Sequence, residues 1–232
     1  MGIMGRSISR TYISGTALGG AIRPIWSSLR NIYHPNLEVE EAPLFTLDKD
    51  MKNQMGEWKT FDDRQYGGNS SCQVQKMSDE GFIRFSGKLD LDEEKAEELE
   101  VVGGYCAFKG HLSSIVDLRD YEGFLITLRS PMEDAVFTLN LGTTSLFDDD
   151  IYQVKCEIAR SKEWKSLEVP FGAFSLTSHG RVKEYQRAND SLQVESFGFL
   201  FKTADDVTNF TLELKGITAV PVLQEAAGGN PY

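Results

Sequence analysis

The sequence has few of the residues on which most metal and catalytic sites depend. It contains only three histidines and three cysteines in 232 residues. Cys72, Cys106 and Cys156 lie far apart and form no Cys-x-x-Cys pair, so they predict neither a zinc site nor a disulfide framework. We expect them to be buried as small hydrophobic residues in a reducing compartment. His111 and His179 also lack neighbouring metal-type ligands.

The motifs that would indicate a common enzyme class are missing as well. There is no Gly-x-Ser-x-Gly nucleophile elbow, no Gly-x-Gly-x-x-Gly dinucleotide loop and no Gly-Lys-Ser/Thr phosphate loop. The acidic clusters Asp62-Asp63 and Asp148-Asp149-Asp150 could supply calcium ligands, but neither has an EF-hand spacing, and solvated loop acids explain them better. No carboxylate pair stands out for glycoside hydrolysis. We predict a protein that is not an enzyme and that binds no metal or cofactor.

Long hydrophobic runs are absent, and none approaches the roughly 18 residues that a bilayer-spanning helix needs. The formal net charge is −11. An acidic protein repels phosphate backbones and anionic headgroups, which argues against nucleic acid and against electrostatic membrane binding. We therefore expect a soluble protein without a transmembrane segment.

Acidic residues are missing from the first 37 positions, which contain four arginines. This composition is typical of an organellar transit peptide. Met4, Ile8 and Tyr12 would lie on one face of a helix, with arginines opposite. We predict a presequence at residues 1–37, with a disordered tail as the alternative.

Short runs rich in β-branched and aromatic residues, separated by turn residues, fill the rest of the chain. They predict an all-β sandwich at residues 58–220. A polar connector is expected at 38–57, with at most one short helix near 51–58, and a flexible tail at 221–232. The predicted strands are 82–87, 124–129, 135–141, 151–158, 192–201 and 210–217. The acidic stretch 89–100 is expected to be a solvated loop.

The segment from Trp164 to Phe174 contains a strand whose alternating apolar side chains, ending at Phe171, face a core. Pro170 has no backbone N–H to donate, so it must lie at the end or on the edge of the sheet. The aromatic residues that bracket the strand, Trp164 and Phe174, are predicted to pack, although aromatic residues also line binding clefts.

Two pairs of glycines, Gly67-Gly68 and Gly103-Gly104, predict hairpin corners, because consecutive glycines mark tight turns or close backbone approach. Asp63 and Ser70 flank the first pair and can hydrogen-bond the turn backbone. We favour this structural role over ligand binding.

Eight short motifs follow one another along the chain. They are Asp63-Arg-Gln-Tyr-Gly67-Gly68-Asn-Ser70, Phe85-Ser-Gly-Lys-Leu89, Gly104-Tyr105-Cys106-Ala107, Asp117-Leu-Arg-Asp-Tyr121, residues 125–129, Trp164 with Val169-Pro170-Phe171 and Phe174, Gly180-Arg181, and Ser196-Phe-Gly-Phe199. In this order and at similar spacing they resemble the complex I intermediate-associated protein family, over residues 58–220. We expect these family residues to be mainly structural.

The resemblance implies a jelly-roll β-sandwich of the galactose-binding-domain type. It also implies a chaperone-like assembly factor for NADH:ubiquinone oxidoreductase in the mitochondrial matrix, associated with the inner membrane. Complex I subunits, assembly intermediates and other assembly factors are the expected partners, and no catalytic residue or cofactor carries over. The alternative, suggested by the fold alone, is a carbohydrate-binding module whose aromatic residues stack on a sugar; of the three tryptophans, only Trp164 is placed for that role.

Overall fold

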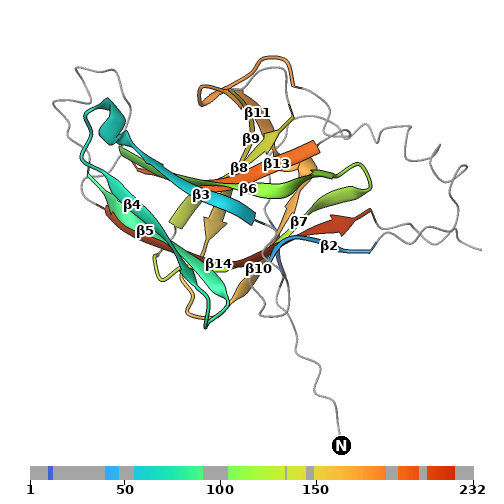
Figure 1. Cartoon of the computed structure of the whole chain (residues 1–232), viewed down its shortest axis with the longest axis horizontal. Helices are drawn as coiled ribbons and strands as arrows, with labels where there is room; N and C mark the ends of the chain where they lie inside the picture. Colours follow the sequence, from blue (N-terminus) through green and yellow to red (C-terminus); the bar gives the residue numbers. More distant parts are fainter. Residues whose placement is uncertain are drawn as a thin grey trace, which may run out of the picture.

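Two seven-stranded sheets face each other in the computed structural model, sheet B above and sheet A below in Figure 1. The structure describes residues 10–12, 40–46, 55–90, 104–133, 135–144, 149–186, 193–203 and 208–222. The two layers pack their apolar faces together and form one core. The all-β jelly-roll sandwich predicted from the sequence is confirmed.

Sheet A is built around β14, the long strand near the end of the chain. In order, it contains β1 (Arg10–Tyr12), β10 (Lys165–Pro170), β7 (Tyr121–Arg129), β14 (Thr208–Pro221), β5 (Phe82–Leu89) and β4 (Ser71–Met77). The second half of β14 also pairs with β2 (Ala42–Thr46). All of these pairings are antiparallel except the one between β1 and β10.

Sheet B is fully antiparallel, with β13 near its centre. In order, it contains β12 (Arg181–Val182), β11 (Ser175–Ser178), β9 (Asp150–Ile158), β8 (Ala135–Thr143), β13 (Gln193–Thr203), β6 (Gly104–Asp117) and β3 (Met55–Asp62). Two short 3₁₀ helices complete the fold: η1 (Asp63–Tyr66) joins β3 to β4, and η2 (Phe171–Ala173) follows β10.

Alternation of buried and open side chains explains why these segments form strands. In β8 and β9 every second side chain is buried, as expected for strands with one face on a core. Aromatic rings link the two sheets: measured between ring centroids, Phe85 of sheet A lies 4.8 Å from Phe108 of sheet B, and Phe210 of sheet A lies 4.9 Å from Phe201 of sheet B. Aromatic pairs of this kind add stability beyond their burial.

All seven predicted strands occur, the one between Trp164 and Phe174 as β10, but the structure differs from the sequence prediction around them. Residues 55–62 form β3, so the short helix predicted near 51–58 is wrong for its described part. The polar connector predicted at 38–57 includes β2, whose Leu44 and Phe45 are buried in the core. Residues 10–12, predicted as part of a basic helix, pair with β10, an edge that would otherwise expose unpaired backbone groups.

Other predictions concern parts of the chain outside the described residues. These parts include residues 1–9 and 13–37 of the predicted presequence, residues 91–100 of the acidic stretch, and residues 223–232 of the predicted tail. Within the described ranges, no helix has the length and apolar character needed to cross a bilayer.

Candidate functional site

One end of the sandwich gathers the first group of family-motif residues around a buried carboxylate. Asp63, only 4% exposed, begins η1 where the chain passes from sheet B to sheet A. Its Oδ1 accepts a hydrogen bond from the Ser70 backbone N–H at 2.9 Å, and its Oδ2 accepts one from the Ser70 hydroxyl at 2.6 Å. The Ser70 oxygen in turn accepts the Asp90 N–H at 3.1 Å. This network ties η1 to the end of β5, and its carboxylate oxygens are already used.

The glycines of this end fit around the same carboxylate. A Cβ at Gly68 would lie 2.3 Å from the Asp63 carboxyl carbon, and one at Gly104 would lie 2.9 Å from the Ser70 hydroxyl. Gly67, with φ +86°, ends η1 in the left-handed region. The prediction of hairpin corners is therefore wrong for Gly67-Gly68, which connects two different sheets, and for Gly104, which begins β6. Gly103 lies outside the described residues.

Two of the three cysteines meet beside this network. The Cys72 thiol lies 3.5 Å from the Phe61 carbonyl oxygen and 3.8 Å from that of Ala107, which is next to Cys106 in β6. A hydrogen bond from the Cys106 thiol lowers the pKa of Cys72, and the same contact raises the pKa of Cys106. Cys72 is half-buried and Cys106 is fully buried. The expectation that all three cysteines are buried thus holds for Cys106 and Cys156 but not for Cys72.

Tyr105 completes this end of the molecule. Its hydroxyl accepts a hydrogen bond from Gln65 Nε2 at 2.7 Å, which fastens η1 to β6. Burial raises the pKa of the Tyr105 hydroxyl. The motif residues from Asp63 to Cys106 thus form one cluster that joins the sheets.

The remaining motif residues lie elsewhere in the fold. Pro170 ends β10 opposite Gly123, and the buried Phe171 and Phe174 lie 4.9 and 6.1 Å from the ring of Phe124. They pack as the sequence predicted. Trp164 is only half-buried.

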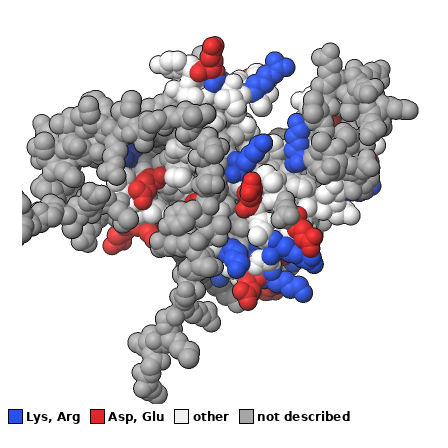
Figure 2. Space-filling model, turned by 180° about the vertical axis from the view of Figure 1, so that it is seen from behind, with Lys and Arg blue, Asp and Glu red and all other residues white. Residues whose placement is uncertain are grey.

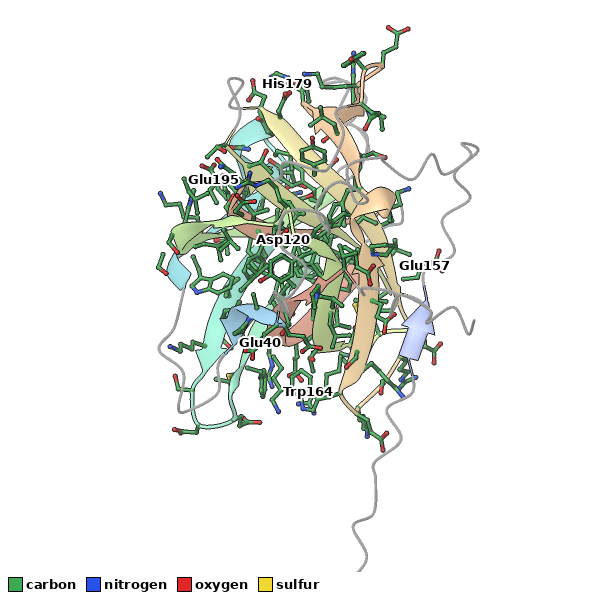
Figure 3. The ribbon with its side chains drawn as sticks, turned by 90° about the vertical axis from the view of Figure 1, so that its right-hand side faces the viewer. Glu40, Asp120, Glu157, Trp164, His179 and Glu195 are labelled. Carbon is green, nitrogen blue, oxygen red and sulfur yellow. The ribbon has the colours of Figure 1, made fainter. Side chains whose placement is uncertain are left out.

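Gly180 lies in the turn between β11 and β12, and Arg181 begins β12. His179 and Gly180 have φ values of +50° and +74°, the pair of positive φ angles that a type I′ hairpin requires. Arg181 is exposed. Figure 3 shows His179 and Trp164 at opposite ends of the sandwich, so the motif residues do not converge on one site.

The outer face of sheet A, formed by the side chains that point away from the core, carries an ion cluster that the sequence analysis missed. Glu213 on β14 lies between Arg84 of β5 and Arg129 of β7; its Oε1 accepts Arg84 Nε at 2.8 Å and its Oε2 accepts Arg129 Nε at 2.5 Å. The Arg129 guanidinium also lies 4.4 Å from the Trp164 ring centroid and 5.4 Å from that of Phe82. Pairing the strands at the correct register would have revealed the cluster, because Arg84, Glu213 and Arg129 face one another across β5, β14 and β7.

The outer face of sheet B, formed in the same way by β3, β6, β13, β8 and β9, has a different composition. Its charged side chains include four lysines, Lys59, Lys109, Lys155 and Lys202, and the acids Glu157 and Asp117; Glu195 adjoins the bulge of β13. Lys59 and Lys109 are directly opposite each other in the ladder of β3 and β6. Like charges at directly opposed positions repel each other.

The centre of this face holds polar groups and little aromatic surface. Gln153 Nε2 donates to Asn140 Oδ1 at 2.8 Å across β9 and β8. Ser196, placed next to a bulge in β13, is fully buried, and its hydroxyl is the one buried side-chain N or O atom without a hydrogen-bond partner in the described structure. Phe61, 41% exposed, lies at the β3 edge.

The acidic clusters do not form a calcium site where the structure describes them. Asp62 accepts from Arg64, and that hydrogen bond lowers the pKa of the Asp62 carboxyl, while Asp63 is used by Ser70. Asp150 is paired with Lys183 at 2.8 Å, and Asp148 lies outside the described residues. Among described residues, no group of three or more His, Cys, Asp and Glu side chains could hold a metal.

Comparison with known sequences identifies one family. The family model described as Complex I intermediate-associated protein 30 matches residues 45–214. A curated relative, the mitochondrial Complex I intermediate-associated protein 30 of Drosophila melanogaster, is 26% identical over 157 residues, which make up 62% of this chain and 51% of the relative. The chain therefore spans about half the length of the curated relative it matches.

Comparison with solved structures finds the same architecture in sugar-binding domains. The family 11 carbohydrate-binding module of a Clostridium thermocellum cellulosomal cellulase matches with a TM-score of 0.52 at 15% identity, covering 82% of this chain and 99% of that one. The same module in complex with a mixed-linked β-1,3-1,4 tetrasaccharide matches with a TM-score of 0.51, also at 15% identity, covering 82% of this chain and 100% of that one. At this identity the likeness shows the fold alone.

Proposed function

Because this chain belongs to the complex I intermediate-associated protein 30 family, we propose that it is a mitochondrial assembly factor for respiratory complex I. The family match carries the proposal, since it runs from β2 into β14 and includes nearly all of the sandwich. The proposed partners are complex I subunits, assembly intermediates and other assembly factors. The proposed location is the matrix, at the inner membrane, which the protein reaches through its partners.

A scaffold acts by offering a rigid surface, and several features support this mode of action. The core is filled by aromatic residues from both sheets, and the buried Asp63 is held by Ser70 at one end. A surface that is already ordered loses little conformational entropy on binding, so more of the contact energy appears as affinity. We propose that the protein has no catalytic step of its own and holds an assembly intermediate until the next subunits join.

Depletion of the protein tests the proposal. Complex I abundance is expected to fall on native gels while the other respiratory complexes stay near normal. The protein is expected to migrate with a complex I sub-assembly and to be absent from the mature complex. Normal complex I after complete depletion would refute the proposal.

The import signal has its own test. We propose that residues 1–37 are removed on import, because four arginines and no acids precede an acidic domain. N-terminal sequencing of the protein from isolated mitochondria is expected to begin near residue 38. A protein that remains in the cytosol would contradict the proposed location.

Sugar binding is the second candidate, favoured by the likeness to carbohydrate-binding modules. Such modules need aromatic faces for stacking, and on the described outer face of sheet B the exposed aromatic residue is Phe61 at the edge. Calorimetric titration with a mixed-linked β-1,3-1,4 tetrasaccharide distinguishes the two functions. Saturable binding at micromolar affinity, together with normal complex I after depletion, would favour the sugar-binding alternative.

A further inference from the structure

Basic side chains collect on the outer face of sheet B although the whole chain carries a net charge of −11. Lys109, Lys155 and Lys202 come from three different strands, β6, β9 and β13. Within the described residues, none of the three has a hydrogen-bond or ion-pair partner. Lys59 lies directly opposite Lys109 in the ladder of β3 and β6 and adds a fourth basic side chain to this face. A face with three lysines that have no partner among the described residues has the electrostatics of a surface that binds acidic groups.

A second, independent observation lies next to Lys109. The bulge in β13 turns Ser196 toward Gly142 of β8, where a Cβ at residue 142 would lie 2.1 Å from Ser196 Oγ and 3.7 Å from Lys109 Nζ. A hydroxyl donor and an ammonium group therefore converge on the space that Gly142 leaves open. The hydroxyl has no partner in the described structure, and a buried hydroxyl without one is costly. A carboxylate that draws Lys109 aside could accept hydrogen bonds from both groups.

The surroundings of this point suit a polypeptide better than a sugar or a polyanion. The Asn140 and Gln153 side chains present amide groups that can pair with an extended backbone, and Leu200 and Phe61 offer apolar contacts on the same face. No tryptophan lies on the described outer positions of these strands, so a sugar ring has little to stack on. A nucleic acid or an anionic bilayer would be repelled by the negative charge of the rest of the chain.

We infer that the outer face of sheet B binds an acidic, extended segment of a partner protein. Its carboxylates pair with Lys109, Lys155 and Lys202, one of them also accepting the Ser196 hydroxyl, and its apolar side chains lie against Leu200 and Phe61. This inference rests on the proposed function, because it names the surface by which an assembly factor would hold its client.

Charge reversal tests the surface in solution. The probe is a short soluble peptide of alternating glutamate and leucine, titrated into the full chain by calorimetry. The triple variant Lys109→Glu, Lys155→Glu, Lys202→Glu should weaken binding about tenfold or more. The matched control reverses three exposed lysines elsewhere, Lys76→Glu, Lys162→Glu, Lys215→Glu, and so has the same net charge. The affinity of this control variant for the peptide should stay within about twofold of that of the wild-type chain.

Two further titrations show whether the binding is specific to this site and to a peptide. Ser196→Ala should weaken peptide binding by roughly twofold to tenfold and leave the unfolding midpoint of the protein unchanged. The mixed-linked tetrasaccharide should not bind. Equal loss in the two triple variants, no loss in either, no binding of the peptide by the wild-type chain, or saturable sugar binding on this face would each overturn the inference.

Rescue of depleted cells separates the inference from the proposed function. If depletion lowers complex I, the wild-type chain and the control variant should restore it, whereas the Lys109, Lys155 and Lys202 variant should not. Full rescue by that variant overturns the inference and leaves the assembly role intact. Normal complex I on depletion refutes the assembly role, and the peptide titration still decides whether this face binds acidic segments.

Discussion

The outer faces of the two sheets use their charges in opposite ways. On sheet A, Glu213 accepts hydrogen bonds from both Arg84 and Arg129, so the charges of that face stabilise the fold. On sheet B, Lys109 lies opposite Lys59 and has no hydrogen-bond or ion-pair partner among the described residues. The space-filling view shows basic and acidic side chains next to one another along the lower part of the molecule, the side of sheet A (Figure 2). The difference indicates that sheet A carries a structural surface and sheet B an available one.

Aromatic side chains strengthen this contrast. On sheet A, Trp164 and Phe82 lie 5.4 Å apart, and both rings lie against the Arg129 guanidinium. That arrangement shields the ion cluster from water and strengthens its pairing. On sheet B, Phe61 has no comparable cover and is 41% exposed. Stability measurements should therefore respond to sheet A substitutions, and binding measurements to sheet B substitutions.

Removal of the central carboxylate should have the largest effect on stability. Glu213→Ala leaves Arg84 and Arg129 close together without their acid, and breaking such a partly buried cluster costs about 3 kcal/mol in the free energy of unfolding. Denaturant melts of the purified variants measure the change. The control is Glu157→Ala on the outer face of sheet B, which should stay within about 0.5 kcal/mol of wild type. Equal losses in the two variants would erase the distinction between the faces.

Removal of the aromatic cover should cost less. Trp164 is half-buried, so Trp164→Ala loses part of a hydrophobic contact together with the cation–π contact to Arg129, roughly 2 kcal/mol in all. Trp164→Phe keeps a ring over the guanidinium and should lose about half as much. The same melts decide the matter. An alanine variant with the wild-type midpoint would show that Trp164 is a free surface residue, available to a ligand.

Ser196→Ala should have almost no effect on folding stability. The hydroxyl of Ser196 is buried without a partner among the described residues, so folding removes it from water without forming a hydrogen bond in return. Its removal should leave the free energy of unfolding equal to that of the wild type or higher by up to about 1 kcal/mol. Thermal melts give the answer. A clear loss of stability would mean that the hydroxyl supports the fold, and it would weaken the case for a ligand at this point.

Much of the fold could be predicted because alternation leaves a readable pattern. The strands that became β5, β7, β8, β9, β13 and β14 have one apolar face and clear turn residues at their ends. The strand β4 was missed because its side chains alternate only between exposed and half-buried, so its inward residues Cys72 and Val74 give a weak apolar signal. The strand β2 was missed because acids and Pro43 surround its two buried residues, Leu44 and Phe45, and the pairing that orders them comes from the distant strand β14.

The candidate sites were harder to predict, because they depend on pairings between distant strands. Asp63 and Ser70 are close in sequence, so hydrogen bonds from them to the backbone of this segment could be predicted, whereas the contact between the Ser70 hydroxyl and the Asp63 carboxylate could not. Glu213 follows its partners Arg129 and Arg84 by 84 and 129 positions, so no local pattern connects them. Ser196 matters because a bulge turns it toward Gly142, and a bulge leaves no signature in a single sequence.

The smallest expected effect on stability concerns the cysteines, two of which, Cys72 of sheet A and Cys106 of sheet B, lie where the two sheets join. Cys72 of sheet A has a lowered pKa because the Cys106 thiol donates to it, whereas burial raises the pKa of Cys156 in sheet B to about 12. A lowered pKa means more thiolate at a given pH, and the thiolate is the form that alkylating reagents attack. Maleimide should therefore label Cys72 first, at a pH below that needed for a free cysteine, and leave Cys106 and Cys156 intact until the protein unfolds. Mass spectrometry of samples labelled across a pH series follows each site. The control is Cys72→Ser, which should abolish labelling of the folded protein and change its free energy of unfolding by no more than about 0.5 kcal/mol. Equal labelling of Cys72 and Cys106 in the folded protein would mean that the end of the sandwich opens in solution, and the rigid junction on which both faces depend would have to be reconsidered.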